Sequence, residues 1–369
     1  MVRVFQKVLP NSFQRRINMN KKWRVCVIGA GVIGLSTAVN IVENIPDAKV
    51  TVIAEKMTPN TTSDGAAGIW LPPNALNDHE LGTDVNRIRK WCIETREHLG
   101  NLCRSSEAGN AGVQLLTGYH LFKTKNDSNE HMYDTELFPR YNLLSEDQSK
   151  PYSEYKYGSH FTTYLAECRR YLPWLMNRFL RHGGVLQEGK IKSLEELIGK
   201  FDIVITCVGV GAKSLLGDES MVAVRGQLIK VSAPWMKNFV RTFSSSEDAS
   251  DMYIYPGVDV VSLGGTYQVN NCDEENDQGD IDRISKNVAE VVPALKNVKP
   301  LFCWTGIRPC RKNGVRLELD MVEYGKDKLP VIHNYGHGSF GIIVHWGCAL
   351  EATDLVRKCL SQLRLTSRL

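Results

Sequence analysis

The sequence predicts an α/β protein in which a doubly wound parallel domain is interrupted twice by a second domain of mixed α+β character. Three observations lead to this expectation. A strand, a glycine-rich turn and a helix follow one another near the N-terminus, and two later segments again combine apolar strand or helix patterns with glycine-rich turns. Two long stretches of different texture separate these segments, so we expect both domains to be discontinuous in the sequence.

The first unit is a βαβ arrangement. Arg24–Ile28 is a short apolar run, Val32–Glu43 has apolar residues at helical spacing, and Lys49–Ile53 is β-branched and alternating. The turn between strand and helix follows the G-x-G-x-x-G pattern with Gly29, Gly31 and Gly34. Such glycines let the turn close and let the backbone approach a pyrophosphate, whose charge the helix N-terminus favours. Glu55 suits a ribose hydroxyl pair in FAD as well as in NAD, so this unit predicts a dinucleotide site without choosing between them.

Two later segments continue the same domain. LPWLMNRFLRHGG, after Tyr171, has apolar residues at helical spacing and stops at Gly183-Gly184, and FDIVITCVGVG at 201–211 is typical of a buried strand that opens into a glycine loop. Near the C-terminus, the glycines of HNYGHGSFGIIVHWGCALEATDLVRKCL lead into a helix that runs to the tail.

The stretches between these segments form the second domain. Residues 75–161 are polar and rich in turn residues, whereas 218–307 alternate in strand fashion around YIYPG, VVSLGGTYQ and the acidic loop DEEND. The expected division is a leader at 1–22, a nucleotide-binding domain at 23–74, 162–217 and 308–364, a substrate domain at 75–161 and 218–307, and a C-terminal tail at 365–369.

Composition excludes several classes of partner. The chain has 369 residues and a formal net charge of only +4, with basic residues scattered, so we expect no nucleic-acid partner. No apolar run approaches the roughly 18 residues of a membrane span, which predicts a soluble protein without a membrane partner. The ten cysteines form no C-x-x-C pair and no zinc-like spacing with histidine, so they are expected to be reduced thiols, and no metal site is predicted.

Both chain ends carry signals. Residues 1–22 hold six basic residues and no acidic one, a composition that resembles a transit segment, but we favour a disordered leader, and Met19 offers a second start that omits it. The last three residues, Ser367-Arg368-Leu369, are a conservative variant of the Ser-Lys-Leu peroxisomal address. They predict the peroxisomal matrix as location and the import receptor as a partner if the chemistry agrees.

Ten short motifs together resemble the D-amino acid oxidase and D-aspartate oxidase family over nearly all of residues 24–360. They are VIGAGVIGLSTA, TPNTTSDGAAG, AGVQLLTGY, LPWL, VRGQ, APW, YIYPG, LGGT, TGIRP and NYGHGSFGIIVHWGCALEA. The resemblance implies non-covalently bound FAD. TPNTTSDGAAG, at 58–68, is by itself equally well explained as a hydroxyl-rich turn.

The glycine fingerprint and the resemblance together predict a set of cofactor-binding residues, which includes the GHGSFG stretch near the C-terminus. The set is Gly29, Ala30, Gly31, Val32, Ile33, Gly34, Glu55, Lys56, Thr61, Thr62, Ser63, Gly68, Ile69, Ile191, Gly209, Gly338, Ser339, Gly341, Ile342 and Ile343.

The family resemblance also implies the reaction and the residues that serve it. Oxidation of an amino acid at its α-carbon transfers a hydride to the flavin, so the protein must hold that carbon in one orientation. Arg308, in TGIRP, matches the family's arginine for the α-carboxylate, which a planar guanidinium can hold through two oxygens. Tyr253, in YIYPG, matches the tyrosine that shares this carboxylate. With molecular oxygen as second substrate, the products are a 2-oxo acid, ammonia and hydrogen peroxide.

Substrate choice divides the family into enzymes for acidic and for neutral D-amino acids. Several stretches resemble the acidic branch, and Arg241 lies where that branch is expected to have a lid arginine, with Ser339 and Tyr267 as further donors. Tyr267 departs from the branch, which usually has an arginine there. An oxidase of neutral D-amino acids, a non-catalytic flavin-binding protein and a nicotinamide dehydrogenase remain alternatives. His337 and His345 are assigned to structure.

Overall fold

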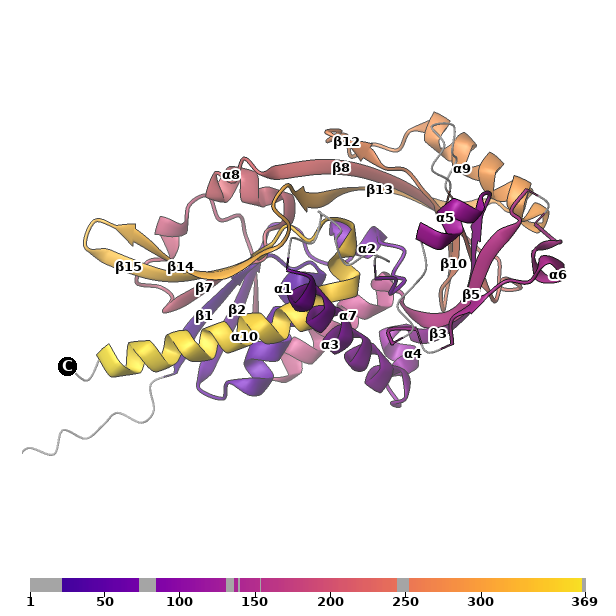
Figure 1. The fold of residues 1–369 in the computed structure, drawn as a ribbon. Helices are drawn as coiled ribbons and strands as arrows, with labels where there is room; N and C mark the ends of the chain where they lie inside the picture. Colours follow the sequence, from indigo (N-terminus) through magenta and orange to yellow (C-terminus); the bar gives the residue numbers. More distant parts are fainter. Residues whose placement is uncertain are drawn as a thin grey trace, which may run out of the picture.

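Two β-sheets and the helices around them organise the chain (Figure 1). The computed structural model describes residues 22–72, 84–130, 136–138, 140–152, 154–243 and 252–366. The expected leader apart from residue 22, the boundary at 74/75 and the tripeptide Ser367-Arg368-Leu369 lie outside these ranges.

Within the described residues, the first sheet has six strands in the order β14-β15-β7-β1-β2-β6. The strands β15, β7, β1, β2 and β6 run parallel, and β14 pairs antiparallel with β15 at one edge. Their bounds are β1 Trp23–Ile28, β2 Ala48–Ala54, β6 Val185–Glu188, β7 Ile203–Thr206, β14 Arg316–Tyr324 and β15 Asp327–Tyr335. All four residues of β7 are buried because helices and loops cover both faces of the sheet at this point.

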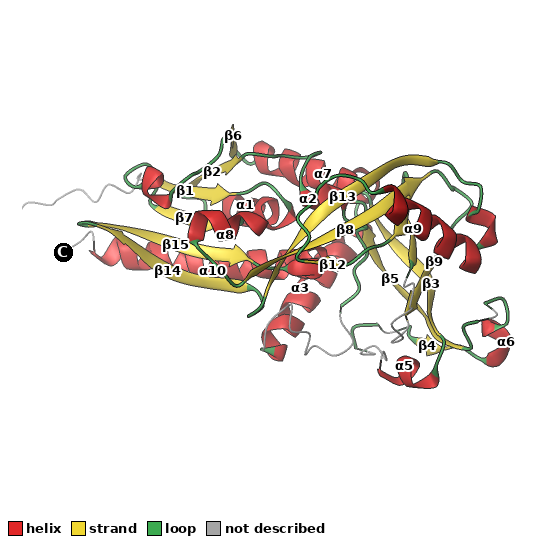
Figure 2. Cartoon of the chain, turned by 90° about the horizontal axis from the view of Figure 1, so that it is seen from above, coloured by secondary structure: helices red, strands yellow, loops and turns green. Residues whose placement is uncertain are grey.

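Four of the five longer helices in the described residues gather around this sheet (Figure 2). They are α1 Val32–Asn44, α3 Val85–Cys103, α7 Cys168–Arg181 and α10 Gly341–Thr366. The predicted βαβ unit, the helix after Tyr171 and the C-terminal helix are confirmed, with ends that differ by one to a few residues. Short helices are α2 Thr62–Gly65, α4 Ala108–Ala111, α5 Lys125–Glu130, α6 Glu146–Ser149 and α8 Ala212–Leu216, and the 3₁₀ turns are η1 Leu194–Leu197, η2 Gly209–Gly211, η3 Pro293–Leu295 and η4 Gly338–Phe340.

The second sheet contains nine strands in the described part of the chain. They are β3 Val113–Phe122, β4 Asn142–Leu143, β5 Tyr157–Ala166, β8 Met221–Val231, β9 Phe239–Phe243, β10 Tyr253–Pro256, β11 Val261–Gly264, β12 Gln268–Val269 and β13 Pro300–Arg311. Helix α9, Gln278–Val291, lies beside it. Strands β8 and β13 form a long antiparallel pair that runs from the first-sheet side of the molecule to the second sheet (Figure 1). Two expected domain boundaries, 161/162 and 307/308, fall inside β5 and β13.

Helix α3 lies in the stretch 75–161, for which the polar, turn-rich sequence predicted no helix. Its buried residues recur at helical spacing, as Ile88, Trp91, Cys92, Thr95 and Leu99. Asp84 caps its first turn by accepting a hydrogen bond from the backbone N–H of Arg87 at 3.1 Å. The amphipathic spacing was therefore present in the sequence, but the many charged residues between the apolar ones concealed it.

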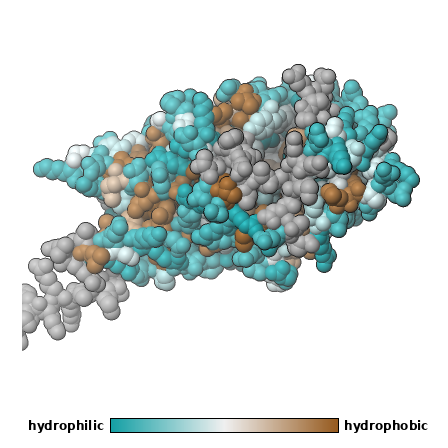
Figure 3. Space-filling model, in the orientation of Figure 1, coloured by the Kyte–Doolittle hydropathy of each residue, from teal (hydrophilic) through white to brown (hydrophobic). Residues whose placement is uncertain are grey.

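None of the helices in the described residues is long and apolar enough to cross a lipid bilayer. Among the coloured residues on the face drawn in Figure 3, hydrophilic ones predominate, and hydrophobic ones gather mainly towards the left.

Candidate active site

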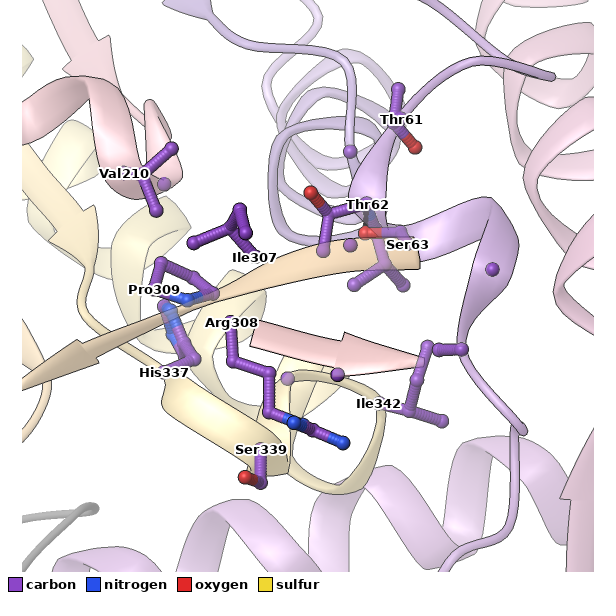
Figure 4. Close-up of a pocket in the computed structure, with 18 of the residues that line it drawn as sticks. Thr61, Thr62, Ser63, Val210, Ile307, Arg308, Pro309, His337, Ser339 and Ile342 are labelled. Carbon is purple, nitrogen blue, oxygen red and sulfur yellow. Dashed lines mark hydrogen bonds between the residues drawn. The ribbon is translucent and has the colours of Figure 1, made fainter. Parts of the chain in front are cut away.

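A cavity of about 950 Å³ is lined by residues from both sheets. Its walls include the carboxyl ends of β1, β2 and β7, the α2 turn, strands β8, β9, β10 and β13, and the start of α10 (Figure 4). The carboxyl ends of parallel strands are where open α/β sheets bind their ligands. The cavity therefore joins the expected dinucleotide site to the second sheet.

The turn after β1 is shaped for close backbone approach. Gly29 has φ +109°, and a Cβ at this position would lie 2.3 Å from the carbonyl oxygen of Cys207. A Cβ on Gly34 would lie 1.9 Å from the carbonyl oxygen of Gly29, so only glycine lets α1 pack directly against the turn. The backbone N–H of Val32, at the start of α1, donates to Ser63 Oγ at 3.0 Å. A negatively charged group such as a pyrophosphate fits beside this turn.

Of the residues expected to bind the cofactor, Gly34 does not line the cavity. Its place is behind the turn, where it allows the helix and the turn to touch. All the others line the cavity: Gly29, Ala30, Gly31, Val32, Ile33, Glu55, Lys56, Thr61, Thr62, Ser63, Gly68, Ile69, Ile191, Gly209, Gly338, Ser339, Gly341, Ile342 and Ile343.

The Thr61–Ser63 segment is both a turn and a wall of the cavity. Thr61 begins α2 through a capping box in which Asp64 accepts hydrogen bonds from the Thr61 backbone N–H at 2.9 Å and from its Oγ1 at 2.6 Å. Thr58 Oγ1 adds a further donor to Asp64 at 2.6 Å. Because Asp64 is fully buried, this network fixes the segment against the cavity. The two interpretations of the hydroxyl-rich stretch are therefore compatible.

Ion pairs lie at the end of the cavity marked by Glu55. Glu55 pairs with Lys190 at 3.0 Å, and Lys56 pairs with Glu274 at 3.2 Å. Glu274 belongs to the acidic loop DEEND, which was not among the predicted site residues and which lines the cavity through this side chain. The loop is held by buried Arg225, which donates to the carbonyl oxygens of residues 273 and 275 at 3.0 and 2.7 Å. The loop thus brings the second sheet to the nucleotide end of the cavity.

Arg308 occupies the wall that β8 and β13 share. Its Nη1 donates to the carbonyl oxygens of Arg225 at 3.3 Å and Thr266 at 3.1 Å, which orients the guanidinium. A Cβ on Gly226 would lie 2.3 Å from Arg308 Nη1, so this glycine leaves the space that the guanidinium fills. Tyr267 lies over Arg308, with its ring centroid 5.5 Å from Cζ. In Figure 4, Arg308 and Ser339 lie on one side of β13 and Thr61 on the other.

A second arginine and two stacked tyrosines line the same cavity. Arg241 pairs with Tyr253 in the β9–β10 ladder, and the rings of Tyr253 and Tyr255 stack at 4.5 Å. Burial raises the pKa of Tyr253, and the guanidiniums of Arg308 and Arg241 partly oppose that rise. Burial also raises the pKa of Tyr255 to about 12. Both phenols therefore stay protonated at neutral pH and can donate hydrogen bonds.

The structure brings together all four residues expected to serve the substrate, Arg308, Tyr253, Arg241 and Ser339. Cavity-lining residues that were not predicted for the site from the sequence include Lys190, Gly226, Tyr255, Glu274 and Trp304. Of these, Gly226 and Tyr255 lie within the motifs VRGQ and YIYPG, so the signal was present without a role attached. Among the described residues, no group of three or more His, Cys, Asp or Glu is arranged to hold a metal ion.

Solved structures with a similar fold include two bacterial glycine oxidases. The enzyme from Geobacillus kaustophilus has a TM-score of 0.72 at 17% identity, and that from Bacillus cereus has 0.70 at 18%. In both cases 91% of this chain and 95% of the other are covered. At this level of identity the comparison shows the fold.

Sequence comparison gives the family. Residues 24–355 match the DAO family profile, described as FAD dependent oxidoreductase. Among characterised relatives, human D-aspartate oxidase is 40% identical over 342 residues, which cover 92% of this chain and 96% of the human one. D-amino acid oxidase of Dugesia ryukyuensis is 35% identical, with 92% and 99% covered. This chain therefore belongs to the DAO family of FAD-dependent oxidoreductases, and its cofactor is FAD.

Proposed function

We propose that this protein oxidises acidic D-amino acids, D-aspartate foremost and D-glutamate with it, to the 2-oxo acid, ammonia and hydrogen peroxide. The observation that carries the proposal is that Arg308 and Arg241 line the same cavity as the glycine-rich turn. A dicarboxylate requires two cationic partners, because an unpaired buried carboxylate is costly. The similarity to human D-aspartate oxidase supports the same substrate class.

The first sheet and its helices form the FAD-binding domain in this proposal, and the second sheet forms the substrate domain. The turn at Gly29–Gly31, the start of α1 and the Thr61–Ser63 segment would hold the pyrophosphate of FAD, and Gly338–Ile343 would hold the flavin. Glu55 would bind the ribose hydroxyls. The bound cofactor would supply the acceptor for the hydride of the substrate α-carbon and the route of the electrons to molecular oxygen.

Arg308 binds the substrate α-carboxylate. Its Nη1 is held by two carbonyl oxygens, so the guanidinium presents a fixed donor edge to the cavity. The Tyr253 hydroxyl donates to the same carboxylate. Two anchors on one carboxylate fix the orientation of the α-carbon, which is the main requirement that this reaction places on the protein.

Arg241 binds the side-chain carboxylate of the substrate. It lies on β9, on the wall that also carries Tyr253 and Tyr255, so a substrate whose α-carboxylate is held by Arg308 and Tyr253 extends towards it. Ser339 and Tyr267 supply additional hydroxyl donors on the cavity wall. This arrangement favours a short dicarboxylic amino acid over a neutral one.

Tyr267 supports a second candidate, an oxidase of neutral D-amino acids. It stands where the acidic branch is expected to have an arginine, and it covers Arg308 with an aromatic ring. An aromatic lid over the carboxylate site would suit an apolar side chain.

A peroxide assay with a panel of D- and L-amino acids separates these candidates. We expect yellow protein that releases all its flavin on acid precipitation, and peroxide formation that is fastest with D-aspartate. Preference for D-alanine or D-methionine would replace the acidic assignment with the neutral one. Absence of peroxide with every D-amino acid, from protein that retains its flavin, would identify a non-catalytic flavoprotein.

We also propose the peroxisomal matrix as the location, with the import receptor as a partner. Ser367-Arg368-Leu369 support this, and the peroxide product makes proximity to catalase useful. A fluorescent fusion with a free C-terminus should be punctate and coincide with a peroxisomal marker, and deletion of Leu369 should disperse it. A mitochondrial pattern that depends on residues 1–22 would refute this location.

A further inference from the structure

A buried row of hydrogen-bonding rings leads away from the cavity and takes no part in substrate binding as described above. It consists of His98 on α3, Tyr171 on α7 and His345 on α10. His98 Nε2 lies 2.8 Å from Tyr171 Oη, and His345 Nε2 lies 2.9 Å from the same oxygen. The hydroxyl can donate to one nitrogen while it accepts from the other, so it couples the tautomers of the two imidazoles.

The row is held firmly and reaches the surface at one end. Tyr171 and His345 are fully buried. His98 stacks on Trp346, with ring centroids 3.5 Å apart and planes at 11°, and it is partly exposed. A proton that moves outward along this row therefore reaches solvent at His98.

The inner end of the row lies next to the cavity wall. His337 lines the cavity and is buried. A Cβ on Gly341 would lie 3.9 Å from the Cβ of His337, and His345 follows Gly341 by one helical turn on the same face of α10. His337 therefore packs over the helix face that carries His345.

His337 and His345 each have one ring nitrogen whose hydrogen-bonding capacity is not used by the described residues. Within the described part of the chain, His337 Nε2 and His345 Nδ1 are both buried and neither has a hydrogen-bond partner. Buried polar atoms are nearly always hydrogen-bonded in folded proteins. Since the two residues pack together and no direct hydrogen bond joins these nitrogens, one water between them would connect them.

The charge states suit a relay. Burial lowers the pKa of His337 and of His345 to about 3, and it lowers the pKa of His98 well below its usual value. Burial also raises the pKa of Tyr171 well above its usual value. All four groups are therefore neutral at physiological pH, and each ring has one donor and one acceptor, as a chain of proton transfers requires.

We propose that His337, His345, Tyr171 and His98 form a proton path from the cavity to the surface, which carries away the proton that the substrate nitrogen releases during oxidation. This rests on the oxidase function proposed above. When R–CH(NH3+)–COO− becomes R–C(=NH2+)–COO−, the α-carbon loses a hydride to FAD and the nitrogen loses one proton. The C–H and one N–H bond break, and a C=N bond forms.

The proton moves outward by shifts along the row. His337 takes up a proton on the cavity side and passes one from Nε2, through one bridging water, to His345 Nδ1. His345 Nε2 passes a proton to Tyr171 Oη, and Tyr171 passes its own to His98 Nε2. His98 then releases one to solvent from its other nitrogen, so no charge remains in the interior.

Rapid-reaction measurements on Tyr171→Phe test the path. The variant keeps the ring and removes the shared hydroxyl. Thr353→Val is the matched control, because Thr353 has a buried hydroxyl on α10 that donates within that helix, to the carbonyl oxygen of Ala349 at 2.8 Å. D-aspartate and its α-deuterated form are each mixed with holoenzyme in H2O and in D2O, and the loss of flavin absorbance is followed.

We expect Tyr171→Phe to lose flavin absorbance about tenfold more slowly than wild type or slower still, with a larger solvent isotope effect and a smaller α-deuterium effect. Thr353→Val should match wild type in both isotope effects. If Tyr171 has only a structural role, the variant reacts more slowly but its solvent isotope effect does not rise and its α-deuterium effect does not fall. That result would overturn the proposal. An unchanged rate would do so as well.

The second measurement does not depend on turnover. In holoenzyme with 15N-labelled histidine, the ring-nitrogen NMR signals of His98 and His345 should both shift in Tyr171→Phe and stay in place in Thr353→Val. If they do not respond, the row is absent and the proposal falls. If wild-type protein is inactive but the His98 and His345 signals still both shift in Tyr171→Phe, the result would refute only the oxidase function. His345→Gln, read by the same two experiments, replaces Tyr171→Phe if that variant fails to fold.

Discussion

Replacement of Arg241 by alanine tests the substrate assignment most directly. D-aspartate and D-alanine differ at the β-carbon, where D-aspartate has a carboxylate and D-alanine has none. Arg241 is the residue proposed to bind that carboxylate, from its position beside Tyr253 on the cavity wall. The expected loss is therefore specific to D-aspartate.

The magnitude follows from the type of contact. A hydrogen bond to a charged group contributes roughly 1.5–3 kcal/mol, so kcat/KM for D-aspartate should fall by roughly ten- to a hundred-and-fiftyfold. Arg241 also forms a hydrogen bond with Tyr255, and loss of that contact affects both substrates alike. The ratio of the D-aspartate loss to the D-alanine loss removes this shared part, as a double-mutant cycle does.

The assay is initial-rate peroxide formation with both substrates on wild type, Arg241→Ala and Arg241→Lys. Lysine keeps the charge without the planar fork and should give an intermediate ratio. Arg357→Ala, a change on the exposed outer part of α10, is the control and should leave both rates unchanged. Equal losses with the two substrates would show that Arg241 supports the pocket without binding the side chain, and the reasoning would be wrong.

Three further predictions follow from the site and its surroundings. Arg308→Leu should retain flavin and lose roughly thirtyfold to several thousandfold in kcat/KM, because loss of one member of a buried charge pair costs ~2–5 kcal/mol; a near-normal rate would assign the carboxylate to another residue. Gly34→Ala should lower Tm and speed FAD release, since its Cβ would lie 1.9 Å from the Gly29 carbonyl oxygen; wild-type thermal melts and flavin release would contradict this. Burial alone would raise the pKa of Asp218, but hydrogen bonds led by that from Arg311 outweigh it and hold the pKa at about 2, below the usual 3.8. This carboxylate therefore stabilises the fold above about pH 4, and that contribution is lost as the pH falls towards 2; Asp218→Asn should flatten this part of the pH–stability curve measured by denaturant titration.

The nucleotide end of the site was the most predictable part of the molecule. The βαβ unit rests on local signals, namely the apolar periods of β1, α1 and β2 and the glycines between them. Two backbone segments can approach closely only at a glycine, so the glycines alone predict that another backbone segment lies close to this turn. The sequence does not predict which segment it is, and the structure shows that the Cys207 carbonyl oxygen lies beside Gly29.

The contacts that join the two sheets could not be derived from local patterns. Lys56 and Glu274 are 218 positions apart, and their pairing depends on Arg225, which holds the acidic loop from inside the protein. From the sequence alone, Arg225 looks like an arginine on the exposed face of a strand. Its burial, and the role of Gly226 in making room for Arg308, follow only from the register between β8 and β13.

The packing of α10 against α1 and α3 has a consequence for biosynthesis. The cavity is walled by the first strand–turn–helix unit and by the start of the last helix, and Trp70 Nε1 donates to the carbonyl oxygen of Ile343, which is 273 positions further along the chain. A ribosome exposes these two walls at opposite ends of translation. The emerging polypeptide therefore cannot assemble a complete flavin pocket until the start of α10 has left the ribosome, and cofactor loading must wait until then.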